Sequence, residues 1–319
     1  MIFLFQLIIL VALAGSLVGW GAVFRRLARK QPVLARQTRP PVPWGLIDLL
    51  LATLLLMTFQ LLNVWILTGM LGIQPSRGWE DVSARDLTLI LFCEPVANLA
   101  AIAAAVAAIG LRTRASAADF GISWRNVWQD MWLGTVAFVM LAPLVYGLQW
   151  LLVIWFPYEH PLISALEKHP DLLVQSAVFF SAVVGAPVVE EFFYRVLWQG
   201  GLQAFVPRRG DFWHFVFGNA MFPGATPAGL LASDGNGGIT TRHQAPAAEV
   251  FAILTSSALF ALMHVSHGAA PIPLFVLALG LGFVYARTGR VLPCIVIHVW
   301  LNAWSLVTLW IGTVVGPGS

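Results

Sequence analysis

Six polar residues in three long apolar stretches of the sequence are of types that can take part in acid–base chemistry or support it. They are Glu190, Glu191 and Arg195 in 173–205, His264 in 248–266, and His298 with Asn302 in 291–314. An ionisable side chain in a membrane helix costs about 2.5–3.5 kcal/mol on insertion scales, so its presence calls for a function. Two carboxylates, two imidazoles and a carboxamide on separate helices predict one convergent polar site.

Helical spacing suggests a different role for each of these residues. Glu191 and Arg195 are four residues apart and share a helix face, so they can form an ion pair that offsets part of the cost of burying both. Glu190 lies about 100° round the helix from Glu191 and can face the bundle interior as a general base for water. His298 and Asn302 also share a face and could together bind a carbonyl oxygen as it becomes negative.

Three short segments carry a family resemblance. Residues 190–195 read Glu-Glu-Phe-Phe-Tyr-Arg, residues 260–264 read Phe-Ala-Leu-Met-His, and residues 298–302 read His-Val-Trp-Leu-Asn. They resemble the EExxxR, FxxxH and HxxxN motifs of the CPBP intramembrane proteases, which include the CAAX prenyl endopeptidases and bacteriocin-processing or immunity homologues. One motif alone is weakly specific, but here all three occur in the family's order.

The resemblance implies hydrolysis of a peptide bond inside the membrane. It implies that Glu190 activates water with help from His264, and that His298 and Asn302 form the oxyanion side. The expected partners are the lipid bilayer and a peptide or protein substrate, with or without a lipid modification, and no nucleic acid. The catalytic candidates are therefore Glu190, Glu191, His264, His298 and Asn302, with Arg195 in a supporting role.

We expect no cofactor. Glu190, His264 and His298 could bind a divalent metal such as zinc, but the sequence contains neither an HExxH motif nor a Cys/His zinc pattern. A tightly bound metal is therefore not favoured.

The composition places the motifs in a membrane protein. Of 319 residues, 59% are hydrophobic and 10% are charged, whereas soluble chains average about 25% charged residues. The fold class predicted is all-α, a polytopic transmembrane helical bundle of about eight spans. The predicted spans are 2–24, 44–71, 87–111, 131–156, 173–205, 248–266, 271–287 and 291–314.

The spans predict a division of the chain at residue 112. Residues 1–112 hold three spans and a basic loop, and residues 113–319 hold the protease-like core. The core includes a long Gly- and Pro-rich loop at 207–247, expected to be a flexible insertion rather than a lid. Residues 115–128 are expected to form a short helix at the cytoplasmic interface that begins at Ser116.

The basic residues predict the orientation in the membrane. Short loops rich in Lys and Arg lie in the cytoplasm, which places 25–39, 112–125 and 287–290 inside and both termini outside. The expected location is the cell inner (plasma) membrane. This alternation puts His264 near the outer end of its span and His298 about 12 Å into its own, so the two meet only if the sixth helix begins late, tilts or continues past the bilayer.

Two other functions fit the same residues. A transporter could use them as a proton relay, although no inverted repeat is visible. A non-catalytic immunity or scaffold protein would keep its function after Glu190→Gln. Two further ionisable residues are expected to have other roles: Glu94, next to Pro95, in local hydrogen bonding at a kink, and His267 in an interfacial loop.

Overall fold

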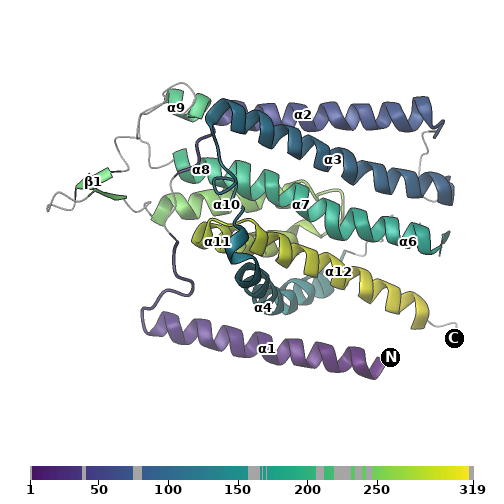
Figure 1. Cartoon of the computed structure of the whole chain (residues 1–319). Helices are drawn as coiled ribbons and strands as arrows, with labels where there is room; N and C mark the ends of the chain where they lie inside the picture. Colours follow the sequence, from purple (N-terminus) through teal and green to yellow (C-terminus); the bar gives the residue numbers. More distant parts are fainter. Residues whose placement is uncertain are drawn as a thin grey trace.

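The computed structural model describes residues 2–37, 41–74, 81–156, 166, 168–169, 171–205, 212–218, 231–233, 239–241 and 246–315. Within these residues the chain is helical, which confirms the predicted all-α class (Figure 1). The exception is a small antiparallel hairpin of β1 (Leu231–Ser233) and β2 (Ile239–Thr241), in which Ala232 pairs with Thr240.

Seven helical segments of the described chain are long and apolar enough to cross a membrane, and they make this an integral membrane protein. The segments are α1 (Ile2–Ala28), α2 (Leu46–Trp65) with η1 (Ile66–Met70), α3 (Ala84–Thr113), η3 (Trp124–Asn126) with α4 (Val127–Val153), the composite helix Leu172–Phe205, α11 (Pro271–Thr288) and α12 (Leu292–Val315). The composite helix consists of α6 (Leu172–Phe179), η4 (Phe180–Gly185), α7 (Ala186–Glu191), η5 (Phe192–Gln199) and α8 (Gly200–Phe205).

The predicted span 248–266 is shorter in the structure. It forms α10 (Pro246–Leu262), a helix of 17 residues. At 1.5 Å per residue α10 rises about 25 Å, less than the roughly 30 Å of the hydrocarbon layer. The prediction of about eight spans is thus met by seven helices of membrane length and one shorter apolar helix.

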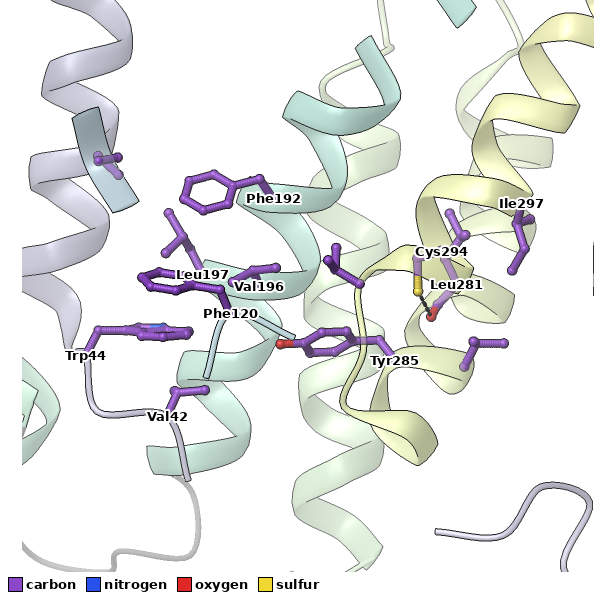
Figure 2. Close-up of a cluster of buried hydrophobic side chains, with 14 of the residues drawn as sticks. Val42, Trp44, Phe120, Phe192, Val196, Leu197, Leu281, Tyr285, Cys294 and Ile297 are labelled. Carbon is purple, nitrogen blue, oxygen red and sulfur yellow. Dashed lines mark hydrogen bonds between the residues drawn. The ribbon is translucent and has the colours of Figure 1, made fainter. Parts of the chain in front are cut away.

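An aromatic and aliphatic core holds the composite helix against its neighbours. Figure 2 shows Trp44, before α2, next to Phe120, which follows α3, and their rings stack with centroids 5.0 Å apart. Phe120 in turn contacts Phe192 of η5, at 6.4 Å between ring centroids. Tyr285 of α11 and Cys294 of α12 are fully buried on the other side of the same cluster. These contacts fix η5, and with it the glutamates of α7, between α11 and the loops that flank α2 and α3.

Buried acidic residues fasten the helix ends to one another. Asp130, in the first turn of α4, is wholly buried and its Oδ1 lies 3.0 Å from Arg290 Nε, before α12. Asp48 of α2 binds Arg112, at the end of α3. Glu249 of α10 binds two arginines, one before α2 and one in the last turn of α11. All these pairs lie at the end of the bundle where the basic residues gather.

Helix α1 lies at the edge of the bundle against α4 (Figure 1). Ser16 Oγ and Trp20 Nε1 both donate to the backbone oxygen of Met140, at 3.1 and 3.0 Å. A Cβ on Gly19 would lie 2.7 Å from Met140 Cγ, so glycine allows the two helices to approach closely. Small residues and interhelical hydrogen bonds are the usual means of packing membrane helices, because apolar burial gives no advantage over lipid.

Residues 115–128 do not form the continuous helix predicted for them. The expected contact at its start is present, since Asp119 Oδ2 accepts from the backbone N and the Oγ of Ser116, both at 2.7 Å. Gly121 then adopts φ +76°, and a Cβ there would lie 2.9 Å from the Gly289 carbonyl oxygen. The chain therefore turns at Gly121 to pack on the α11–α12 connection, and helix resumes only at η3.

The loop predicted at 207–247 is described only in part. It contains α9 (Phe212–Phe217), β1 and β2, while its run Gly235 to Gly238 lies outside the described residues. Arg112 Nη2 donates to the Phe217 carbonyl oxygen at 3.1 Å, which attaches α9 to the end of α3. The α9 part of the loop is therefore helical and bound to the bundle.

Candidate functional site

The helix that carries the two glutamates is irregular on both sides of them. The π-helical segments η4 and η5 flank α7, and π-helical turns inside α-helices occur frequently at functional sites. A Cβ on Gly185, the last residue of η4, would lie 2.4 Å from Pro95 Cβ. The glycine thus lets the composite helix cross α3 closely, just before Glu190 and Glu191.

The ion pair predicted between Glu191 and Arg195 is present. Arg195 Nε donates to Glu191 Oε2 at 3.0 Å, and both side chains are completely buried. Arg195 Nη1 donates to Ser256 Oγ of α10 at 2.9 Å, and the guanidinium lies 5.6 Å from the centre of the Phe260 ring. The pair therefore connects the composite helix to α10 as well as compensating charge within its own helix.

The imidazole of His298 lies between the two glutamates. Its Nδ1 is 3.1 Å from Glu191 Oε1 and its Nε2 is 3.7 Å from Glu190 Oε2. His298 is buried, whereas the Glu190 side chain is 25% exposed. Glu191 accepts from Nδ1, so Nε2 is the nitrogen that the ring presents to Glu190. Within the described residues, Glu190 Oε2 has no hydrogen-bond partner.

His264 reaches this cluster through Phe260. It follows α10 by two residues, and its Nδ1 lies 2.8 Å from the Phe260 carbonyl oxygen. The Phe260 ring contacts the ring of His264, with centroids 5.0 Å apart, and that of His298, at 5.7 Å. His264 is also close enough to Glu190 for their charges to interact. The expected mismatch in depth does not arise, since one ring, that of Phe260, contacts both imidazoles.

Asn302 lies one turn beyond His298 on α12. Its Nδ2 donates to the backbone oxygen of Ala182 in η4 at 2.7 Å. A carboxamide nitrogen carries two hydrogens, so one N–H remains for another acceptor. The structure thus brings Glu190, Glu191 and His298 into direct contact and places Asn302 next to them, bonded to the composite helix.

Ser256 and His267 complete the site, and the sequence did not single them out for it. Ser256 accepts from Arg195 and its own Oγ donates to the Tyr194 carbonyl oxygen at 2.8 Å. His267, expected in an interfacial loop, has its ring 5.7 Å from that of His264. Burial and the neighbouring His264 lower the pKa of His267. The three-residue spacing of the histidines was the available signal for this contact.

Glu94 lies outside this cluster. It is exposed on α3, and no hydrogen bond to its side chain is found among the described residues, so the local bond expected at Pro95 is not observed. Pro95 itself is buried against Gly185. Glu94 is therefore a membrane-embedded carboxylate that can serve as a control for the glutamates of the cluster.

The described histidines, cysteines and acidic residues include no set of three arranged to hold one metal ion. Glu190, His264 and His298, considered above as possible ligands, thus do not form such a set. What the cluster offers chemically is a carboxylate oxygen, imidazole nitrogens and a carboxamide N–H.

A cavity of about 640 Å³ adjoins the cluster. It lies between α4, α12 and the connection from α10 to α11, and its wall is mainly apolar. Its polar lining includes Tyr146, Gln149, His267, Asn302, Ser305 and Thr308. Asn302 and His267 belong both to this wall and to the cluster.

Comparison with known proteins identifies one segment. Residues 235–304 match the family described as Type II CAAX prenyl endopeptidase Rce1-like. The matched segment contains the FxxxH and HxxxN motifs and begins after the two glutamates at positions 190 and 191. The family resemblance predicted from the motifs is confirmed over this segment. No match was found among curated proteins or among solved structures.

Proposed function

Since residues 235–304 match the Rce1-like family of type II CAAX prenyl endopeptidases, we propose that this chain is an intramembrane endopeptidase of the CAAX-protease type. Its substrate is a membrane-associated protein or peptide. The observation that carries the proposal is the position of His298, whose ring nitrogens face Glu190 and Glu191 at 3.7 and 3.1 Å.

In this proposal Glu190 is the general base. Its Oε2 accepts no hydrogen bond from the described part of the chain, so it can accept one from a water molecule and take its proton. The water oxygen then attacks the peptide carbonyl, and His264 assists from the far side of Phe260. As the C–N bond breaks, the proton passes from Glu190 to the leaving nitrogen.

His298 and Asn302 stabilise the tetrahedral intermediate. In its imidazolium form His298 donates through both ring nitrogens, through Nδ1 to Glu191 and through Nε2 to the developing oxyanion. The second N–H of the Asn302 carboxamide is available to the same oxygen. Donors held in place before the reaction stabilise such an anion most strongly in a site that contains little water.

Glu191 and Arg195 act as positioning residues. Glu191 Oε1 fixes the ring of His298, and Arg195 holds the other carboxylate oxygen at 3.0 Å. Because Arg195 also binds Ser256, the orientation of His298 depends on contacts from α7, η5 and α10 together. Loss of any of these contacts should misplace His298, the proposed oxyanion donor, without removing Glu190, the proposed base.

The test is a comparison of peptide termini in membranes from cells that express the wild-type chain, Glu190→Gln or Glu94→Gln. We expect new termini with the wild type and with Glu94→Gln, and none with Glu190→Gln at equal expression. The Glu94 variant removes an intramembrane carboxylate outside the cluster, so it is the matched control. Termini that persist in Glu190→Gln, or their absence in all three samples, would contradict the proposal and favour a transporter or a non-catalytic protein.

A further inference from the structure

The two ends of the bundle differ in charge. One end carries most of the described basic side chains. At the other end the described basic side chains are those of Arg85 and Lys168. The basic end comprises Arg25, Arg26, Arg29, Lys30, Arg36, Arg112, Arg114, Arg125, Arg287 and Arg290. Basic residues at the ends of membrane helices mark the cytoplasmic side, so the opposite end is the non-cytoplasmic one.

The cavity beside the cluster lies in the half of the bundle away from the basic end. Gln149 is 22 residues after the start of α4, which corresponds to a rise of about 33 Å, and Ser305 is 13 residues into α12, about 20 Å. Both helices begin at the basic end, so these cavity residues face the non-cytoplasmic half.

The cavity exists because two helices are short. α10 has 17 residues and α11 has 18, whereas α4 has 27 and α12 has 24. The turn between α10 and α11 therefore stops inside the bundle, and Ala269, Ala270 and Pro273 in and after this turn line the cavity. The space that longer helices would fill is left between α4 and α12.

We propose that this cavity receives the substrate as an extended peptide from the non-cytoplasmic side and leads it to the cluster, an inference that rests on the proposed protease function. The substrates are then segments exposed on, or entering the membrane from, the non-cytoplasmic face. A cytoplasmic C-terminus would not reach the site by this route.

The lining of the cavity suits a peptide better than a plain hydrocarbon chain. Leu152, Leu306 and Leu309 provide an apolar wall, and Gln149, Thr308 and Asn302 provide hydrogen-bonding groups along it. An extended peptide inside a membrane needs partners for its backbone N–H and C=O groups. An acyl or isoprenoid chain has no polar groups, so it would leave the polar side chains of the lining without a partner. The volume of about 640 Å³ is within the range of ligand-binding pockets.

The route ends at the catalytic candidates. Asn302 lines the cavity, and its neighbour one turn back is His298. His267 lines the cavity too, and its ring contacts His264. A peptide in the cavity thus approaches the proposed oxyanion donor and the assisting histidine from the same side.

Labelling of single cysteines tests the side of access without any need for activity. Cys93 is first replaced by alanine, and Cys294, which is fully buried, is kept. In right-side-out and inside-out vesicles, a membrane-impermeant maleimide is reacted with Ser305→Cys in the cavity or with Val307→Cys as the matched control. Val307 is two residues away on α12, exposed on the surface but not part of the cavity wall. Arg125→Cys reports the basic end.

We expect Ser305→Cys to react at least tenfold faster in right-side-out than in inside-out vesicles, and at least tenfold faster than Val307→Cys. Arg125→Cys should react only in inside-out vesicles. Faster labelling of Ser305→Cys in inside-out vesicles, or equal labelling of Ser305→Cys and Val307→Cys, would overturn the proposal.

A second test fills the cavity. Leu306→Trp should lower the yield of Glu190-dependent termini at least tenfold, whereas Val307→Trp should leave it within twofold of the wild type. The termini themselves should map to the non-cytoplasmic side of their proteins. Cytoplasmic termini, or full activity of Leu306→Trp, would refute the access route while leaving the protease function standing. A lack of Glu190-dependent termini would refute the protease function, and the labelling result would still decide the access route.

Discussion

Replacement of Arg195 by methionine should strongly destabilise the fold, because it leaves the Glu191 carboxylate buried without its cation. Both side chains are completely buried, and their N–O distance is 3.0 Å. Removing one partner of a buried ion pair costs about 3–5 kcal/mol. We expect Arg195→Met near the lower end of that range, since His298 Nδ1 still lies 3.1 Å from the carboxylate.

Ser256 provides a second perturbation of the same network. Ser256→Ala removes the acceptor of Arg195 Nη1, and leaving a charged donor buried without a partner costs about 1–3 kcal/mol. In the Arg195→Met background the same change should cost clearly less, with a coupling of about 1 kcal/mol or more between the two. Ser257 is equally buried, and its Oγ has no hydrogen-bond partner in the described structure. Ser257→Ala is therefore the matched control and should cost less than Ser256→Ala.

The free energy of unfolding can be measured by titrating the purified protein in mixed micelles with SDS and following helicity by circular dichroism. The reasoning would be refuted if Arg195→Met stayed within about 1 kcal/mol of the wild type, the value of a surface pair. It would also be refuted if Ser256→Ala cost the same in both backgrounds.

Three further predictions follow from individual contacts. Gly19→Leu should loosen α1 from α4 and lower the melting temperature while cleavage persists, because a Cβ at that position would lie 2.7 Å from Met140 Cγ. Phe260→Ala should cost about 3–5 kcal/mol in the same SDS titration and reduce cleavage, since this ring separates and contacts both imidazoles. Acid should destabilise the fold through His267: its folded-state pKa is lowered by burial and by His264, so the unfolded chain binds the proton more tightly. Stability is then lost as the pH falls below about 6.5, and His267→Gln should flatten the dependence of melting temperature on pH.

Each of these predictions has a clear opposing result. An unchanged melting temperature in Gly19→Leu would mean that α1 is held elsewhere than at Met140. Normal stability and cleavage in Phe260→Ala would remove the ring from the site. If His267→Gln and the wild type showed the same change of melting temperature with pH, the acid sensitivity would belong to other groups.

Local spacing was sufficient to predict the contacts made within one helix. Glu191 and Arg195 form their pair because the four-residue spacing holds at the boundary from α7 to η5. The all-α class and the apolar helices also followed from the sequence, because a run of apolar residues has few alternatives to a membrane helix. The assignment of catalytic roles to these residues stays a prediction.

Contacts between helices were less accessible to sequence reasoning. Which glutamate receives His298 Nδ1 depends on how α12 is rotated relative to α7, and no local pattern encodes that angle. The length of α10 was overestimated because the apolar residues continue to Val265, whereas the helix ends at Leu262. The role of Ser256 was missed, since a serine in an apolar helix gives no signal until its partner Arg195 is placed beside it.

The most direct test of the proposed chemistry is the rate of a single turnover on a substrate identified from the peptide termini. Rates would be compared for the wild type, Glu190→Gln, His298→Asn and the double variant in the same lipid environment. Loss of a general base should lower the rate about 10²–10⁴-fold, and the double variant should be little slower than the slower single variant, because groups that act as a unit are not additive. A Glu190→Gln rate within tenfold of the wild type would contradict the account.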